Sequence, residues 1–171
     1  GPPMFANGFY NNNYLLVQTP DAVMINVEMN HDARIVRLNS RHRTDNVRPY
    51  FGDSIGWWEG DTFVMESVNV KPLQGETMSF PLSKKGVVTE RLTRTSDHDV
   101  VYQFVVDDPE TYTQTWKAEL AFYPSDGLYE YACHEGNYGL HGILAGARRF
   151  EADGIPQQIR KPTFGDLEDE G

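Results

Sequence analysis

The chain of 171 residues is poor in cysteine and in basic residues, and it lacks long apolar runs. Its single cysteine, Cys133, cannot form an internal disulfide, which excludes a disulfide scaffold. No run of about 18 apolar residues occurs, so we expect no membrane span. Lys and Arg number 15 against 25 Asp and Glu, for a formal net charge of −10. Because an acidic surface repels phosphate backbones, we expect no nucleic-acid partner.

Long helical periodicity is also missing, and a strand-and-turn pattern takes its place. Runs rich in Val, Ile, Thr, Tyr and Phe alternate with clusters of Asp, Asn, Gly and Ser. The polar links "NHD", "EGD" and "SDHD" each join two such runs and predict antiparallel hairpins. The runs predict strands at 13–19, 22–29, 33–39, 62–70, 87–94, 100–107, 112–123 and 127–134, with a short further strand at 54–58.

Eight or nine strands in meander order need closed or covered edges. This favours an all-β fold, an antiparallel up-and-down barrel of the lipocalin-like kind, with a two-sheet sandwich as the alternative. We predict a barrel domain at 1–150 and an extended or disordered acidic tail at 151–171. The helix candidate "GLHGILAGARRF" (139–150) contains three glycines, so we expect one to three turns.

The sequence assigns neither a cellular compartment nor an assembly state. The opening "GPP" is typical of a scar left by protease cleavage, which leaves room for a leader that was removed. The protein would then be periplasmic or secreted, and otherwise cytoplasmic. A homo-oligomer is compatible with the sequence.

The segment "EMNHDAR" places Glu28, His31, Asp32 and Arg34 at one predicted hairpin. A histidine beside carboxylates that orient it is typical of a proton carrier. The alternative is a solvated turn with an Asp–Arg pair. Neighbouring side chains of a strand point to opposite faces, so we do not expect His31 and Asp32 to pair with each other.

The segment "YEYACHEGNYG" holds the cysteine, a histidine and two glutamates. Strand alternation points Cys133 and His134 to opposite faces, which disfavours a Cys–His nucleophile and predicts Cys133 as a small buried residue. We expect the strand to end near His134. This would free His134 and Glu135 at the barrel mouth to meet "EMNHDAR".

Two further strand glutamates, Glu66 and Glu90, each share a face with apolar neighbours. Either that face looks into the barrel, where burial would raise the pKa of the carboxyl, or it looks to solvent. In "SIGWWEGD", Trp57 and Trp58 point to opposite faces. One of them is expected in the core, and the other at a pocket or a barrel end.

Three stretches together resemble a family of small, often exported bacterial proteins of uncharacterised function. They are "YNNNYLLVQTPDAVMINVEMNHDARIV", "FGDSIGWWEGDTFVMESVNV" with "ERLTR", and "VDDPETYTQTWKAEL" followed by "YEYACHEGNYGLHGILAGAR". The resemblance covers roughly residues 10–148. Trp57 stands where members of that family commonly have arginine. The resemblance implies no specific chemistry, and "GWWEGD" is also loosely similar to lipocalin-like barrels.

These features predict an enzyme that performs cofactor-free acid–base chemistry on a small molecule in a barrel pocket, as a lyase, isomerase, dehydratase or cyclase. No GxSxG, P-loop or Rossmann fingerprint occurs, which argues against serine hydrolases, kinases and dehydrogenases. One alternative is a lipocalin-like binding protein for a small hydrophobic or sugar ligand. Another is a metal-dependent lyase or hydrolase with histidine and carboxylate ligands to a divalent metal.

The residues expected to act fall into two sets. The predicted catalytic residues are His31, His134, Glu28, Asp32 and Glu135. The predicted substrate-binding residues are Tyr14, Arg34, Trp58, Tyr129, Tyr131 and Asn137.

Overall fold

The computed structural model describes residues 1–4, 12–45, 47–71, 80–132, 136 and 138–155. The chain divides into two compact units, Gly1–Tyr131 and Ala132–Gly171. The first unit contains a β-sheet, and the second contains the helix α2 (Gly139–Ala152).

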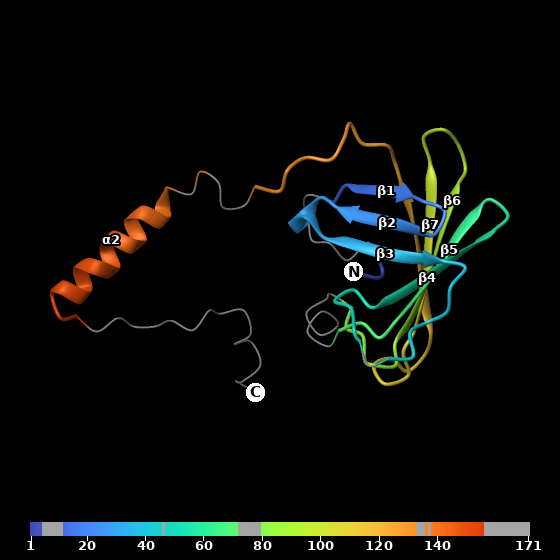
Figure 1. Ribbon diagram of the computed structural model, residues 1–171, viewed down its shortest axis with the longest axis horizontal. Helices are drawn as coiled ribbons and strands as arrows, with labels where there is room; N and C mark the ends of the chain where they lie inside the picture. Colours follow the sequence, from blue (N-terminus) through green and yellow to red (C-terminus); the bar gives the residue numbers. More distant parts are fainter. Residues whose placement is uncertain (5–11, 46, 72–79, 133–135, 137, 156–171) are drawn as a thin grey trace. The chain divides into compact units, whose positions relative to one another are not determined.

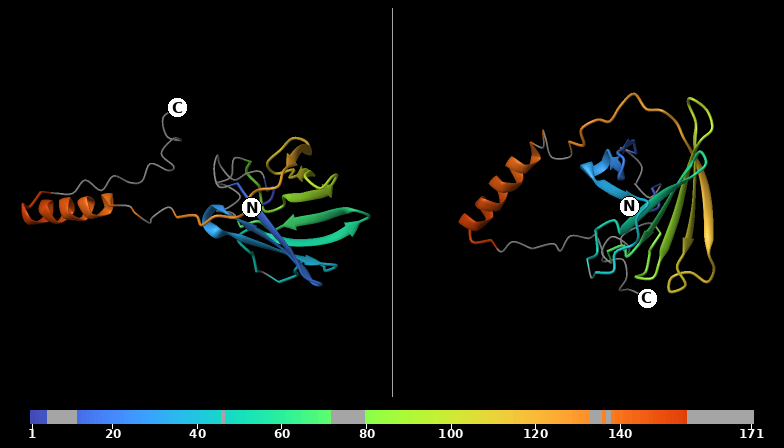
Figure 2. Two further views of the ribbon diagram at one scale, coloured as in Figure 1. Left: turned by 90° about the horizontal axis from the view of Figure 1, so that it is seen from above. Right: turned by 45° about the vertical axis from the view of Figure 1, so that its right-hand side comes forward.

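Eight strands in sequence order form the sheet of the first unit. The sheet curls into a lipocalin-like half-barrel whose edge strands are β1 and β8 (Figures 1 and 2). The predicted all-β fold is therefore confirmed. The strands are β1 (Tyr14–Gln18), β2 (Ala22–Val27), β3 (Ala33–Leu38), β4 (Asp53–Glu59), β5 (Thr62–Val68), β6 (Val87–Arg94), β7 (Val100–Asp107) and β8 (Trp116–Phe122).

One strand pair departs from the expected antiparallel order, because β3 and β4 pair in parallel. A parallel pair needs a connection that returns the chain to the same end of the sheet, and residues 39–52 form that connection. The two strands also approach closely at Gly56. A Cβ there would lie 2.8 Å from Val36 Cγ1 and 2.9 Å from the Phe63 ring, so the position requires glycine.

The prediction of a last strand at 127–134 is wrong for residues 127–132, the part of it that the structure describes. The sheet ends with β8 at Phe122, and residues 127–132 are not in a strand. Pro124 and Gly127 follow β8, and Gly127 has a φ of 148°. Proline lacks the N–H that a ladder needs, and glycine favours a change of direction, so pairing stops here. The three predicted hairpins, by contrast, join the antiparallel pairs β2–β3, β4–β5 and β6–β7.

Alternate side chains of the strands fill the concave face of the half-barrel, as period-2 patterning requires. Tyr102 lies at the centre, fully buried, with its ring stacked on Phe122 at a centroid distance of 5.1 Å. Phe122 also stacks on Tyr14 at 5.8 Å, which links the two edge strands across the core. Further core residues are Val23, Ile25, Val36, Phe63, Met65, Val88, Leu92, Phe104 and Val106.

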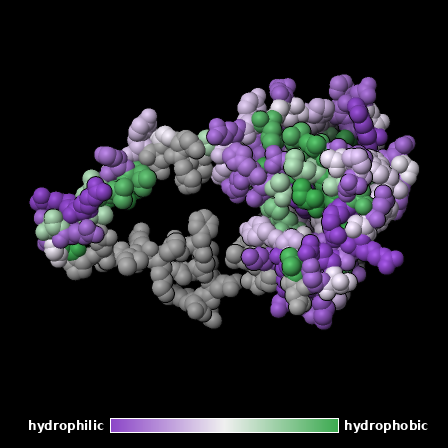
Figure 3. Space-filling model, in the orientation of Figure 1, coloured by the Kyte–Doolittle hydropathy of each residue, from purple (hydrophilic) through white to green (hydrophobic). Residues whose placement is uncertain are grey.

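Helix α2 has 14 residues, more than the one to three turns expected. Its apolar residues recur at the spacing of one helical face, which supports a helix despite the glycines. These residues are Leu140, Ile143, Leu144 and Ala147, and Figure 3 shows hydrophobic residues (green) beside hydrophilic ones (purple) on the helix. Within the described part of the chain, no helix is both long and apolar enough to cross a lipid bilayer.

Candidate functional site

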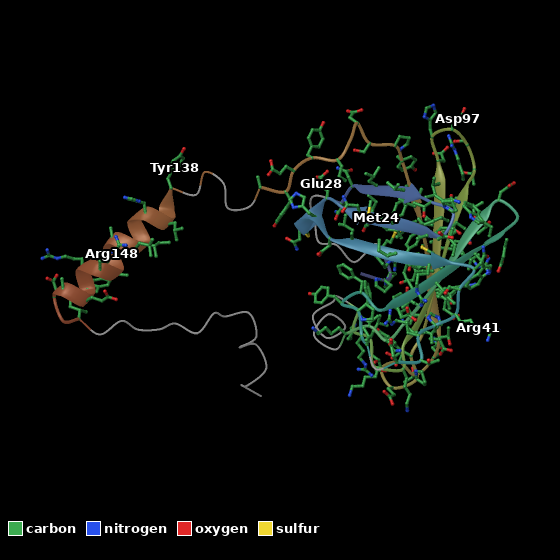
Figure 4. The ribbon with its side chains drawn as sticks, viewed as in Figure 1. Met24, Glu28, Arg41, Asp97, Tyr138 and Arg148 are labelled. Atoms are coloured by element: carbon green, nitrogen blue, oxygen red, sulfur yellow. The ribbon has the colours of Figure 1, made fainter. Side chains whose placement is uncertain are left out.

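A cavity of about 660 Å³ opens between the edge strands β1 and β8 of the half-barrel. Its walls are mainly apolar and include Leu16, Val23, Phe63, Leu92 and Phe122. Charged and polar side chains gather where the β4–β5 and β6–β7 turns approach the cavity, and Figure 4 labels one of them, Asp97. The polar set is Asp61, Arg94, Ser96, Asp97, His98 and Asp99.

Two of the predicted substrate-binding residues, Tyr14 and Trp58, line this cavity. Strand alternation places both on the concave face, and Trp58 packs on Phe63 at a centroid distance of 5.2 Å. Trp57 points to the opposite face, where its Nε1 donates a hydrogen bond to Glu59 at 2.8 Å. The two tryptophans face apart as expected, and Trp58 is the one at the cavity. The expectation that one of them lies in the core is wrong, because Trp58 is 49 % exposed and Trp57 is only half-buried on the outer face.

Beneath the apolar walls lies a fully desolvated ion pair. Arg34 Nη1 contacts Glu90 Oε2 at 2.6 Å, and the two side chains are 5 % and 0 % exposed. The hydroxyl of Tyr102 donates to the other carboxylate oxygen, Oε1, at 2.7 Å. Arg34 Nη2 also contacts Met65 Sδ at 3.7 Å. Every oxygen of the Glu90 carboxylate therefore has a hydrogen-bond partner, as a buried charge requires.

Two tyrosines beside this pair are held in the protonated form. Burial raises the pKa of Tyr102 well above its usual value, and the neighbouring charge of Glu90 raises it further. Burial also raises the pKa of Tyr14. Both hydroxyls are therefore hydrogen-bond donors at neutral pH.

Residues 1–4 lie against this polar group. The N–H of Met4 donates to Tyr102 Oη at 2.8 Å and to Glu90 Oε1 at 3.2 Å. The carbonyl oxygen of Met4 accepts a hydrogen bond from the hydroxyl of Tyr14. Met4 is 2 % exposed and belongs to the core of the half-barrel.

The predicted "EMNHDAR" residues separate into two places. Glu28 and His31 lie on the turn between β2 and β3, where Met29–His31 form a 3-10 turn (Figure 4). Arg34 points instead into the half-barrel to Glu90. Asp32 lies between these places, and burial raises the pKa of its carboxyl.

The turn does meet part of "YEYACHEGNYG", although through backbone groups. The N–H of Tyr129 donates to Glu28 Oε2 at 3.0 Å, and the N–H of Tyr131 donates to His31 Nε2 at 3.0 Å. The rings of His31 and Tyr131 also contact edge to face at 6.5 Å. Asn13 Nδ2 donates to the same Glu28 oxygen at 2.9 Å, and Asn13 lines the cavity.

Four residues of that segment, Cys133, His134, Glu135 and Asn137, lie outside the described residues. Their predicted roles stay predictions. Among the residues that the structure describes, no group of three or more His, Cys, Asp or Glu side chains is arranged to hold a metal ion.

A second charged cluster was missed from the sequence and lies around Asp53. His42 Nδ1 contacts Asp53 Oδ2 at 2.9 Å, and His42 Nε2 contacts Glu66 Oε1 at 3.0 Å. Arg37 Nη2 donates to Asp53 Oδ1 at 2.7 Å, and the N–H of Arg43 donates to Oδ2 at 2.7 Å. The alternation of β5 showed Glu66 on a face with apolar neighbours, but nothing in the spacing pointed to His42 as its partner.

Comparisons of this chain with protein-family models, with curated proteins and with solved structures gave no match.

Proposed function

We propose that the half-barrel binds a small molecule with a mainly apolar body in the cavity between β1 and β8. The observation that supports this is the cavity of about 660 Å³, walled by apolar and aromatic side chains with polar groups at one side. Ligand pockets typically have about 300–1,000 Å³ and this kind of lining. An apolar body would lie against Leu16, Phe63 and Phe122, and a polar end would face the turns.

Binding is favoured over catalysis because of what the acid–base candidates contact. Glu28 and His31 accept hydrogen bonds from the backbone N–H groups of Tyr129 and Tyr131, which is a structural use of their lone pairs. Neither side chain lines the cavity. The side chains that do line its walls contribute apolar surface, whose removal from water favours binding by about 25 cal/mol per Å².

Two neighbouring leucines of β1 allow a matched test. Leu16 and Leu15 are 44 % and 46 % exposed, but only Leu16 lines the cavity. The probe is the neutral fluorophore N-phenyl-1-naphthylamine, whose emission rises in apolar surroundings. We expect saturable binding, weakened at least ~10-fold by Leu16→Arg because a charge is costly in an apolar cavity. Leu15→Arg should leave the affinity unchanged.

The tryptophans give a second readout of the same site. Excitation of Trp58 should transfer energy to the bound probe, so Trp58→Phe should reduce the transfer more than Trp57→Phe does. Equal affinities for Leu16→Arg and Leu15→Arg, or no saturable binding to the folded protein, would contradict the proposal.

Acid–base conversion of the bound molecule is a second candidate function, and the contact between Asn13 and Glu28 favours it. Asn13 lines the cavity and also binds Glu28, so the turn with Glu28 and His31 lies beside the site. Once a ligand is known, incubation followed by mass spectrometry tests for a product. Glu28→Gln and His31→Gln should abolish conversion and keep the affinity. Conversion at the unchanged rate in both variants would exclude these residues as catalysts.

A further inference from the structure

The backbone of Met4 is bound by side chains from three strands, two of which are distant from it in sequence. Its N–H donates to Tyr102 on β7 and to Glu90 on β6, at 2.8 and 3.2 Å. Its carbonyl oxygen accepts from Tyr14 on β1. Both polar atoms of this residue are therefore satisfied inside the half-barrel by side chains.

Strand pairing plays no part in holding this segment. Residues 1–4 belong to none of the eight strands, and they make no backbone–backbone hydrogen bond with other described residues. Pro2 and Pro3 are buried as well, and proline has no N–H donor that would need a partner there. This is how a protein holds a bound peptide, with side chains on the amide and a pocket around the apolar residue.

The partners are also held by contacts that do not involve residues 1–4. Arg34 fixes Glu90 through the buried 2.6 Å ion pair, and Tyr102 donates to Glu90 at 2.7 Å. Preorganised groups bind at a lower entropic cost than groups that must be ordered. The carboxylate accepts from the N–H of Met4, and the protonated Tyr14 donates to the carbonyl oxygen of the same residue, so the set is complementary to the backbone of one residue.

We propose that Glu90, Tyr102 and Tyr14 form a peptide-binding site inside the half-barrel, which residues 1–4 of this chain fill in cis. The ligand class is a short bent peptide in which prolines precede an apolar residue the size of methionine. Its recognised elements are the amide N–H, the carbonyl and the apolar side chain of that residue. This site shares Tyr14 with the cavity of the small-molecule proposal, but it also depends on Glu90 and Tyr102, which do not line that cavity.

The test uses the full chain with Met4→Asp, which places a carboxylate beside Glu90 and should expel residues 1–4 from the site. The probe is the peptide acetyl-Gly-Pro-Pro-Met-Phe-Ala with a fluorophore at its C-terminus, measured by fluorescence anisotropy. We expect the variant to bind this peptide at least ~10-fold more tightly than the unchanged chain does, since a tethered segment competes at an effective concentration of about millimolar. Circular dichroism checks that the variant keeps its β-sheet.

A matched control peptide carries an N-methyl group on the methionine amide and so lacks the N–H donor. It should bind the variant at least ~5-fold more weakly, the loss expected for about one hydrogen bond. Adding Tyr14→Phe to the variant should weaken binding of the unmodified peptide in the same way.

Each other outcome overturns the inference. Loss of the β-sheet in Met4→Asp would mean that residues 1–4 are an integral part of the core. Absence of binding by a folded variant, or equal binding by variant and unchanged chain, would mean that no displaceable peptide occupies the site. Equal affinities of the two peptides would mean that the site does not recognise the N–H of the methionine amide. The naphthylamine probe reports on the cavity, so its result tests the small-molecule proposal and not the peptide-binding site.

Discussion

Two neighbouring residues of β6, Glu90 and Arg91, each take part in an Arg–Glu pair, but on opposite faces of the sheet. Glu90 contacts Arg34 at 2.6 Å inside the half-barrel, where the side chains are 0 % and 5 % exposed. Arg91 contacts Glu59 at 2.7 Å on the outside, where they are 39 % and 46 % exposed. The two ion pairs thus contain the same chemical groups at nearly equal distances, but one pair is buried and the other is exposed to solvent.

We expect solvent exposure, and not the contact distance, to set what each ion pair contributes to stability. Water screens the outer pair and hydrates each of its charges when the pair opens. No water replaces a lost partner of the inner pair, so removing one member leaves an uncompensated buried charge. The cluster around Asp53 lies between these limits, since Asp53 is 3 % exposed and His42 is 23 % exposed.

The largest effect is expected from breaking the inner pair. Glu90→Gln keeps the shape of the side chain but leaves the charge of Arg34 buried without its counter-ion, and it should lower the free energy of unfolding by about 3–5 kcal/mol. Urea unfolding followed by circular dichroism measures this. The control is the double variant Arg34→Met with Glu90→Leu, which removes both charges and should be more stable than Glu90→Gln. A single variant as stable as the unchanged protein would contradict the prediction.

The inner pair also marks the limit of what the sequence predicts. Alternation along β6 placed Glu90 among apolar neighbours but left two options, the interior or solvent. The choice depends on Arg34, which lies 56 positions away and contacts Glu90 only after the sheet has curled. Periodicity is a property of one strand, whereas the partner of a buried charge depends on which strands come to face each other.

Strands could be predicted from local sequence patterns, whereas the parallel pairing of strands and the contacts of loops could not. The strands β1 to β7 follow their local patterns, and their predicted bounds agree with the structure to within two residues. The parallel pairing of β3 with β4 depends on the path of residues 39–52, which no strand pattern encodes. The run at 127–134 alternates like a strand, but its residues Tyr129 and Tyr131 give their N–H groups to Glu28 and His31.

The site was predictable to a similar degree. Tyr14 and Trp58 are side chains of regular strands, so alternation placed them on the face that lines the cavity. The expected meeting of His134 and Glu135 with "EMNHDAR" lies outside the described residues, and the contacts of Glu28 and His31 with the N–H groups of Tyr129 and Tyr131 were not predicted. Met4 could not be predicted as a member of the core, because the contacts that hold it are with residues 86 and 98 positions away.

An intermediate effect is expected at Asp53, with a defined pH dependence. Burial raises the pKa of Asp53, but hydrogen bonds from the Arg43 N–H, His42 and Arg37 outweigh it, so the pKa lies below its usual value. The folded pKa is thus below the unfolded one of ~3.9, so this stabilisation is complete above that value and is lost as the pH falls through the folded pKa. Asp53→Asn should therefore cost about 1–3 kcal/mol at pH 7.

The same variant supplies the pH control. The difference in urea midpoint between Asp53→Asn and the unchanged protein should shrink as the pH falls below ~4, where Asp53 becomes protonated first in the unfolded chain and, at lower pH, in the folded protein. A difference that stays constant from pH 7 into the acid range would show that the carboxylate charge is not what stabilises this cluster.

The smallest effect is expected from the outer pair. Glu59→Gln removes the charge that faces Arg91, yet both side chains stay hydrated, and the amide oxygen still accepts the hydrogen bond from Trp57 Nε1. The urea midpoint should therefore equal that of the unchanged protein within the error of the measurement, at low salt and at 1 M salt alike. A loss comparable to that of Asp53→Asn would mean that the outer pair is shielded from water. In that case the exposed surroundings of the outer pair would not limit its contribution to stability.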